Sequence, residues 1–223
     1  MGEMTTRSYN QFCALASALD HIGDRWTLLI IRELLIGPRR FKDLMYGMPG
    51  ISTNLLSERL KTLEQQGILR QRVLPPPAGS SVYELTPLGQ ALEKPILELG
   101  KWGAQLLPRS LEGIALPSLG SIAVALKAFF HPEATQQVDE TYGLHLDEET
   151  LQVKIEEGEI KIQQGESQKP DADFYTNMQV FLGLFTGQLN PDDAIAKDLV
   201  RIEGDPVALR RFLSYCSVPS SAN

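Results

Sequence analysis

The stretch ISTNLLSERLKTLEQQG, residues 51–67, decides the fold of the N-terminal half of this chain. Leu56, Leu60 and Leu63 recur at spacings of four and three residues, which predicts a helix with one buried apolar stripe. At about 100° per residue, a different set of side chains falls on the opposite face. This outer face carries Asn54, Ser57, Glu58 and Lys61.

The two ends of this helix are also marked in the sequence. Ser52 is a good N-cap, because its hydroxyl can accept a backbone N–H of the first turn that has no partner within the helix. Thr53 then begins the helix. Gly67 predicts the end, since glycine adopts left-handed dihedrals without a Cβ clash.

The flanking segments predict further elements. Residues 12–22 and 26–36 are apolar enough for two helices, and Gly37-Pro38 ends the second. A short helix is expected over 39–45. After Gly67 the pattern predicts strands at 68–74 and 82–85, a Pro/Gly/Ser tip between them, and a helix that starts at Thr86-Pro87 and kinks at Pro95.

This order of elements predicts a winged helix-turn-helix. The major groove of B-form DNA is about 12 Å wide and admits one α-helix, and the second helix of the motif presents side chains to base edges there. Asn54 suits adenine, Lys61 suits guanine or a phosphate, and Ser57 suits either kind of contact. Glu58 can accept from cytosine or repel a wrong approach. The candidate DNA contacts are Arg39, Arg40, Ser52, Thr53, Asn54, Ser57, Arg59, Lys61, Arg70, Arg72 and Ser80.

The charge is distributed unevenly along the 223 residues. Residues 1–107 hold 12 Lys and Arg against 10 Asp and Glu, a net charge of +2, whereas residues 108–223 hold 9 against 18, a net charge of −9. Seven basic side chains lie between positions 39 and 72 and face three acidic ones. The chain therefore resembles a mildly basic module joined to an acidic one, so the overall charge of −7 does not exclude a DNA partner.

Residues 121–216 predict an α+β unit with an antiparallel sheet and helices on one side. Strands are expected at 136–146, 151–156, 159–164 and 172–176, and Glu157-Gly158 predicts a tight hairpin turn. Asn177 and Asn190-Pro191 each start a helix, after a first helix at 121–130, and a last helix covers 207–216. Residues 108–120 are taken as a linker and 217–223 as a tail.

Other features narrow the class of protein. No run of about 18 apolar residues exists, and the N-terminus lacks an apolar signal core, so we expect a cytoplasmic protein without membrane insertion. His21, His131 and His145 lack metal-ligand spacing, and no nucleotide-binding or nucleophile motif is found, so no metal, cofactor or enzymatic activity is expected. Cys13 is a redox candidate, or a packed structural cysteine among apolar neighbours.

Residues 13–103 resemble the HxlR family of bacterial transcription regulators, relatives of the MarR family. The matching runs are ALDHIGDRWTLLIIRELLIGPRRFKDL, ISTNLLSERLKTLEQQGIL and YELTPLG, together with Cys13 and Trp102. Ala14 stands where many relatives have proline. The resemblance implies a homodimer, joined by the first and last helices of the module, that binds double-stranded DNA at a two-fold operator.

Residues 121–215 resemble the sterol-carrier-protein fold through the run DADFYTNMQVFLGLFTGQLNPDDAIAKDLVRIEGDPVALRRFL. This resemblance implies a pocket for a small apolar or amphipathic molecule. The alternative is that the same side chains only fill the core. The candidate lining residues are Phe174, Met178, Phe181, Leu184 and Phe185.

These observations predict a dimeric, ligand-responsive transcription regulator, with residues 1–107 binding DNA and residues 121–216 sensing the ligand. The alternative is a carrier of apolar ligands whose winged helix serves mainly for dimerisation. A methyltransferase is disfavoured, because no glycine-rich nucleotide loop follows a strand and about 100 residues are too few for a Rossmann-type domain.

Overall fold

The computed structural model describes residues 8–75, 79–108, 113–167 and 169–216. The chain forms two compact units that divide between Ile96 and Leu97. This division falls within helix α6 (Glu93–Ala104), so the expected domain limits at 107 and 121 stay a prediction. The expected tail, 217–223, and part of the expected linker lie outside the described residues.

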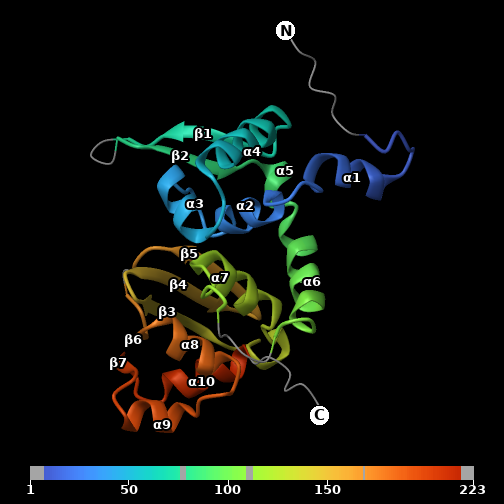
Figure 1. Ribbon diagram of the computed structural model, residues 1–223. Helices are drawn as coiled ribbons and strands as arrows, with labels where there is room; N and C mark the ends of the chain where they lie inside the picture. Colours follow the sequence, from blue (N-terminus) through green and yellow to red (C-terminus); the bar gives the residue numbers. More distant parts are fainter. Residues whose placement is uncertain (1–7, 76–78, 109–112, 168, 217–223) are drawn as a thin grey trace. The chain divides into compact units, whose positions relative to one another are not determined.

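The first unit is the predicted winged helix-turn-helix (Figure 1). A hairpin of two antiparallel strands, paired from Leu69 opposite Leu85 to Val73 opposite Ser81, forms the wing. The central residues of its tip, 76–78, lie outside the described part. The elements are α1 (Ala14–Ile22), α2 (Thr27–Leu34), α3 (Phe41–Gly47), α4 (Thr53–Gln65), β1 (Leu69–Val73), β2 (Ser81–Leu85) and α5 (Pro87–Gln90).

Helix α4 has the polarity that its sequence predicts. Its leucine stripe is buried, with Leu56, Leu60 and Leu63 exposed by only 0%, 2% and 1%. The Ser52 hydroxyl accepts the backbone N–H of Leu55 at 3.3 Å, which confirms the N-cap. Gly67 has a φ of +71°, the left-handed conformation that ends the helix.

The helix expected from Thr86 onward is instead two helices. Helix α5 ends at Gln90, and α6 starts at Glu93 after a turn at Ala91 and Leu92. Pro95 explains this position, because its ring would clash with the carbonyl of the residue four positions earlier, which is Ala91. The proline therefore breaks the helix one turn before itself.

A buried ion pair connects helix α2 to the wing. The Glu33 side chain is fully buried, and its Oε2 lies 3.8 Å from Arg39 Nη2, while its Oε1 accepts from Arg32 Nη2 at 2.7 Å. The Arg39 backbone forms two hydrogen bonds with Tyr83 of β2, at 3.0 and 2.8 Å. A Cβ on Gly47 would come within 2.6 Å of Glu33 Oε2, so glycine leaves room for the carboxylate. One residue, Arg39, thus fixes α2 and the wing to each other.

The second unit is a five-stranded mixed sheet. The strands are β3 (Asp139–Leu146), β4 (Glu149–Glu156), β5 (Glu159–Gln164), β6 (Ala172–Thr176) and β7 (Arg201–Gly204), in the order β5-β4-β3-β6-β7. The expected antiparallel pairings are present, but β3 and β6 run parallel. The short strand β7 was not predicted.

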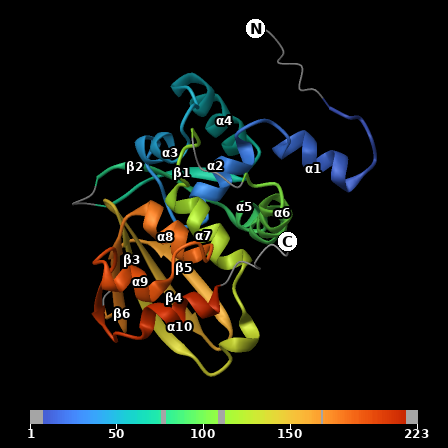
Figure 2. The ribbon, with the colours of Figure 1, turned by 60° about the horizontal axis from the view of Figure 1, so that its bottom comes forward.

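Helices cover one face of this sheet. Along β3, the side chains of Tyr142, Leu144 and Leu146 are buried at alternate positions, which defines the core face. The Phe212 ring lies 5.0 Å from Tyr142 and 5.8 Å from Phe174, measured between centroids. Figure 2 shows α8 and α10 over this face. The helices are α7 (Leu119–Ala128), α8 (Met178–Phe185), α9 (Pro191–Ala196) and α10 (Ala208–Tyr215), and a 3-10 turn covers Pro132–Ala134.

Of the helices that the structure describes, none is long and apolar enough to cross a membrane.

Two adjacent arginines test the buried ion pair. Replacing Arg39 by alanine removes a buried guanidinium from beside Glu33, so we expect the free energy of unfolding to fall by about 3 kcal/mol or more. Replacing Arg40 by alanine removes an exposed side chain and should change it by less than about 0.5 kcal/mol. Urea denaturation followed by tryptophan fluorescence measures both. Equal losses would show that the ion pair does not hold the unit together.

Candidate DNA-binding surface

The outer face of α4 carries a group of exposed polar side chains. Asn54, Ser57 and Lys61 are exposed on the side of the helix away from the buried leucines, and Thr53 is exposed at its first turn. Amide, hydroxyl and ammonium groups in this arrangement can donate to and accept from base edges. The structure therefore brings these four predicted contacts together. Ser52 also lies here, but its hydroxyl is engaged as the N-cap.

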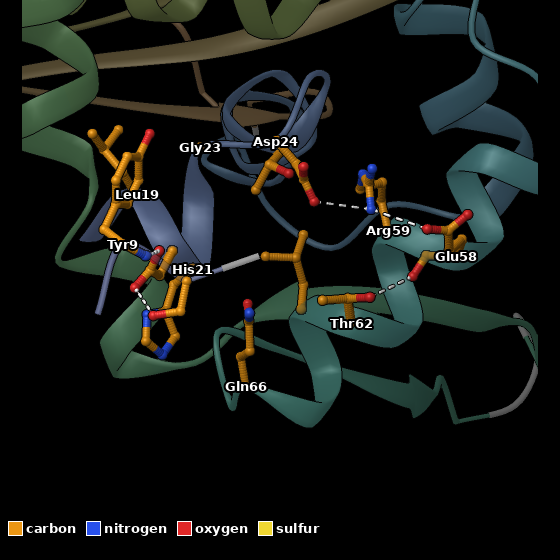
Figure 3. A pocket seen from close by; sticks show the side chains of 13 residues that line it. Tyr9, Leu19, His21, Gly23, Asp24, Glu58, Arg59, Thr62 and Gln66 are labelled. Carbon is orange, nitrogen blue, oxygen red and sulfur yellow. Dashed lines mark hydrogen bonds and ion pairs between the residues drawn. The ribbon is translucent and has the colours of Figure 1, made fainter. Parts of the chain in front are cut away.

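Arg59 differs from the other candidates on α4. Its side chain is only 18% exposed, and Nη1 lies 3.1 Å from both Asp24 Oδ2 and Glu58 Oε1 (Figure 3). It borders a cavity of about 560 Å³ between the N-terminal residues and α4. The prediction that Arg59 contacts DNA is therefore not supported, because its charge is engaged in tying α4 to the turn between α1 and α2.

The wing presents two arginines on one side of β1. Arg70 and Arg72 keep 66% and 43% of their side chains exposed. Both pair with Glu84 of β2: Arg70 Nε lies 2.7 Å from Oε1 and Arg72 Nε lies 2.9 Å from Oε2. The hydrogen bond from Arg72 contributes most to holding the pKa of the Glu84 carboxyl below its ordinary value. The wing thus carries two cations and one ionised carboxylate between them.

Two further candidates are corrected by the structure. Arg39 is 1% exposed and faces Glu33, so it cannot reach a phosphate in this conformation. Ser80 is half-buried and its Oγ is shielded from solvent, and its backbone carbonyl accepts the N–H of Leu74 at 2.9 Å. Arg40, in contrast, is exposed at the start of α3 and keeps the position expected of a phosphate contact.

The sequence was compared with known protein families and relatives. The model of the HxlR-like helix-turn-helix family matches residues 21–111. The transcriptional regulator YodB of Bacillus subtilis is 41% identical over 97 residues, which cover 43% of this chain and 87% of YodB.

The chain belongs to the HxlR-like helix-turn-helix family.

Other relatives align over the same half of the chain. The regulator YtfH of Escherichia coli is 34% identical over 99 residues, or 44% of this chain and 79% of YtfH. The solved structure of the reduced form of YodB is 39% identical, covers 45% of this chain and 99% of that chain, and has a TM-score of 0.39. A second family, the SCP-2 sterol transfer family, matches residues 125–215. This protein therefore joins an HxlR-like unit to an SCP-2-like unit.

The candidate ligand residues of the SCP-2-like unit form an aromatic core. Phe181 and Phe185 stack with 6.4 Å between ring centroids, and Phe129 meets Phe185 edge-on at 6.4 Å. Phe174 stacks on Tyr142 at 5.7 Å. Met178 and Leu184 are 7% and 4% exposed. All five predicted residues are therefore buried, and a ligand among them would have to displace contacts that they already make.

The two cysteines lie in different environments. Cys13 is exposed at the start of α1, and its neighbours Phe12 and Leu15 are exposed as well, so the packed structural role is not seen in a single chain. Cys216 is fully buried, and burial raises the pKa of its thiol to about 12. Only Cys13 is accessible as a redox candidate, and this role stays a prediction.

Sequence reasoning missed the acidic partners of the basic surface. Glu84 and Asp24 lie 14 residues from Arg70 and 35 from Arg59 along the chain, so local charge patterns do not connect them. The hairpin register could have found Glu84, because it places Arg70 directly opposite Glu84. Asp24 offers no such signal, since its contact depends on how the turn before α2 meets α4.

Packing in the SCP-2-like unit can be tested at Phe181. Because this ring is 1% exposed, we expect Phe181→Ala to lower the free energy of unfolding by about 3–5 kcal/mol. Val207 is 50% exposed, and Val207→Ala should change it by less than about 0.5 kcal/mol. Thermal and urea denaturation measure both variants. A loss below about 1 kcal/mol at Phe181 would mean that the ring lines an open pocket.

Proposed function

We propose that this protein binds double-stranded DNA as a homodimer and regulates transcription in response to a small apolar or amphipathic ligand of its SCP-2-like unit. The observation that carries DNA binding is the outer face of α4. Asn54, Ser57 and Lys61 are exposed together, whereas the opposite stripe of leucines is buried. Such a helix can enter the major groove while its apolar side stays fixed to the unit.

The proposed homodimer is supported by apolar surface on α1 and α6. Phe12 and Leu15 are exposed, Leu15 by 68%, and only Ala16 is buried within α1. Leu99 and Trp102 on α6 are exposed by 50% and 61%. Exposed apolar side chains on either helix are typical of a protein interface, and a two-fold dimer places two α4 helices on a two-fold operator.

The proposed ligand response is supported by the SCP-2 match and by the apolar composition of that core. A ligand regulates only if it binds one arrangement of the two DNA-binding units better than the other. The carrier of apolar ligands is the second candidate, and the same SCP-2 match favours it. The two differ in DNA binding, because a carrier gives a weak response to salt, whereas a DNA-binding protein loses affinity steeply as salt rises.

Two substitutions on α4 test DNA binding. Lys61→Ala should weaken binding to all sequences and reduce the salt slope by about 0.9 for each bound α4, because one phosphate contact is lost. Asn54→Ala should cost about 1–3 kcal/mol and relax the preference at one base position. Fluorescence anisotropy with duplexes selected from a random library measures both effects.

The control for this titration is Lys161→Ala, which removes an exposed cation from the SCP-2-like unit and should leave the salt slope unchanged. If wild-type protein selects no preferred duplex and its affinity does not change with salt, the proposal of a DNA-binding regulator is wrong. The proposal of a carrier of apolar ligands is then favoured. If Asn54→Ala weakens every sequence equally, Asn54 does not read a base.

The dimer is tested on α1. Leu15→Glu places a charge on the exposed apolar face, so sedimentation equilibrium should show a shift toward monomer and weaker operator binding. Ser17→Glu adds the same charge to an exposed polar position about 200° further around the helix, and should leave the dimer intact. A Leu15→Glu protein with unchanged mass in solution would contradict an interface on α1.

A further inference from the structure

The wing arginines share a single carboxylate. Arg70 lies directly opposite Glu84 in the hairpin, and Arg72 reaches the same residue along the diagonal. Arg70 donates to Glu84 Oε1 through Nε at 2.7 Å and Nη2 at 2.6 Å; Arg72 donates to Oε2 through Nε and Nη2, both at 2.9 Å. Each carboxylate oxygen therefore holds one guanidinium.

This arrangement leaves the two arginines ready for a partner outside the chain. The Glu84 side chain is 13% exposed, whereas the Arg70 and Arg72 side chains that it pairs with remain 66% and 43% exposed. The contacts made within the described part of the chain use Nε and Nη2 of each arginine, so both Nη1 groups are left for other acceptors. The three side chains together carry one positive charge.

Fixing the two arginines should strengthen binding to DNA whose phosphates match their spacing and weaken binding to other DNA. An arginine loses rotamer entropy when it is fixed, and here Glu84 imposes that order before DNA binds. DNA whose phosphates match the fixed spacing gains from this order. On any other DNA, the carboxylate reduces the net positive charge on which non-specific binding depends.

We propose that Glu84 is a specificity-determining residue, which presets Arg70 and Arg72 as a rigid pair for adjacent backbone phosphates of one groove shape. The pair then reads sequence indirectly, through the width of the groove that the wing meets. This inference rests on the proposed DNA binding. The simpler explanation is that Glu84 only stabilises the hairpin as a cross-strand pair.

The test compares full-length variants on two duplexes of equal length and composition. One duplex is the tightest binder selected by the wild type from a random library, and the other is its scrambled sequence. Glu84→Gln should bind the scrambled duplex about three- to tenfold more tightly, with a salt slope steeper by up to about 0.9 for each wing. The ratio of the two affinities should fall by a similar factor. Fluorescence anisotropy at several salt concentrations gives both numbers.

Glu84→Asp separates geometry from charge. Aspartate keeps the charge but is one methylene shorter, so it cannot hold both guanidiniums as glutamate does. We expect affinity for the scrambled duplex to stay within about twofold of wild type, while affinity for the selected duplex falls about fivefold or more, as for a lost phosphate-positioning contact. Wild-type affinity of Glu84→Asp for the selected duplex would overturn the geometric part of the proposal.

A double-mutant cycle and a charge control complete the experiment. In an Arg70→Ala/Arg72→Ala background, Glu84→Gln should leave the affinity ratio unchanged, because the pair that it orders is gone. Glu98→Gln removes an exposed carboxylate that pairs with Lys101 and should also leave the ratio unchanged. An unchanged ratio in Glu84→Gln, or an equal fall without the arginines, overturns the proposal. Failure of the wild type to select any duplex is a separate result, which overturns DNA binding itself.

Discussion

The DNA-binding unit depends on one buried charge, the carboxylate of Glu33. This group is fully buried, and two arginines from different segments converge on it. Burying charges is costly, and this arrangement persists because the opposite charges and the space at Gly47 are both in place. The backbone of Arg39 also forms two strand-like hydrogen bonds with Tyr83 of β2. These bonds fix the orientation of the wing relative to α2. Without a fixed wing, the outer face of α4 and the arginines of β1 would not keep a fixed position relative to each other.

A second pattern follows on the surface: basic side chains are paired with carboxylates before any DNA is present. Asp24 and Glu58 engage Arg59, and Glu84 engages both Arg70 and Arg72. The seven basic residues counted between positions 39 and 72 therefore overstate the free charge, since one is buried and three are paired. Lys61 and Arg40 are exposed and are not among these paired or buried cations.

The elements that sequence predicted well are those whose signal is local. The leucine stripe of α4, its Ser52 cap and Gly67 all act within a few residues. The turn at Glu157-Gly158, with φ of +50° and +80°, joins strands paired at Glu156 and Glu159, as a two-residue hairpin turn requires. Asn177 accepts the N–H of Val180 at 2.8 Å and starts α8. Each of these can be derived from the conformational preference of one or two residue types.

The features that sequence did not predict depend on distant segments. Strand β7 has four residues, and only its pairing with β6 makes it a strand. The parallel pairing of β3 and β6 joins strands with no turn between them, and the Phe212 ring packs against Tyr142 of β3 and Phe174 of β6. Arg39 follows a helix-ending Gly-Pro pair within a basic segment, so local reasoning placed it on the surface, whereas the buried Glu33 draws it inside.

The packing of the SCP-2-like unit limits how a ligand could influence DNA binding. Its five candidate ligand residues are buried, and the Phe185 ring contacts those of Phe181 and Phe129. A ligand that enters must replace these contacts, so its binding energy is spent first on rearranging the core. A ligand can regulate only through the difference between its binding free energies for two arrangements of the DNA-binding units. A tenfold change in operator affinity requires a difference of about 1.4 kcal/mol.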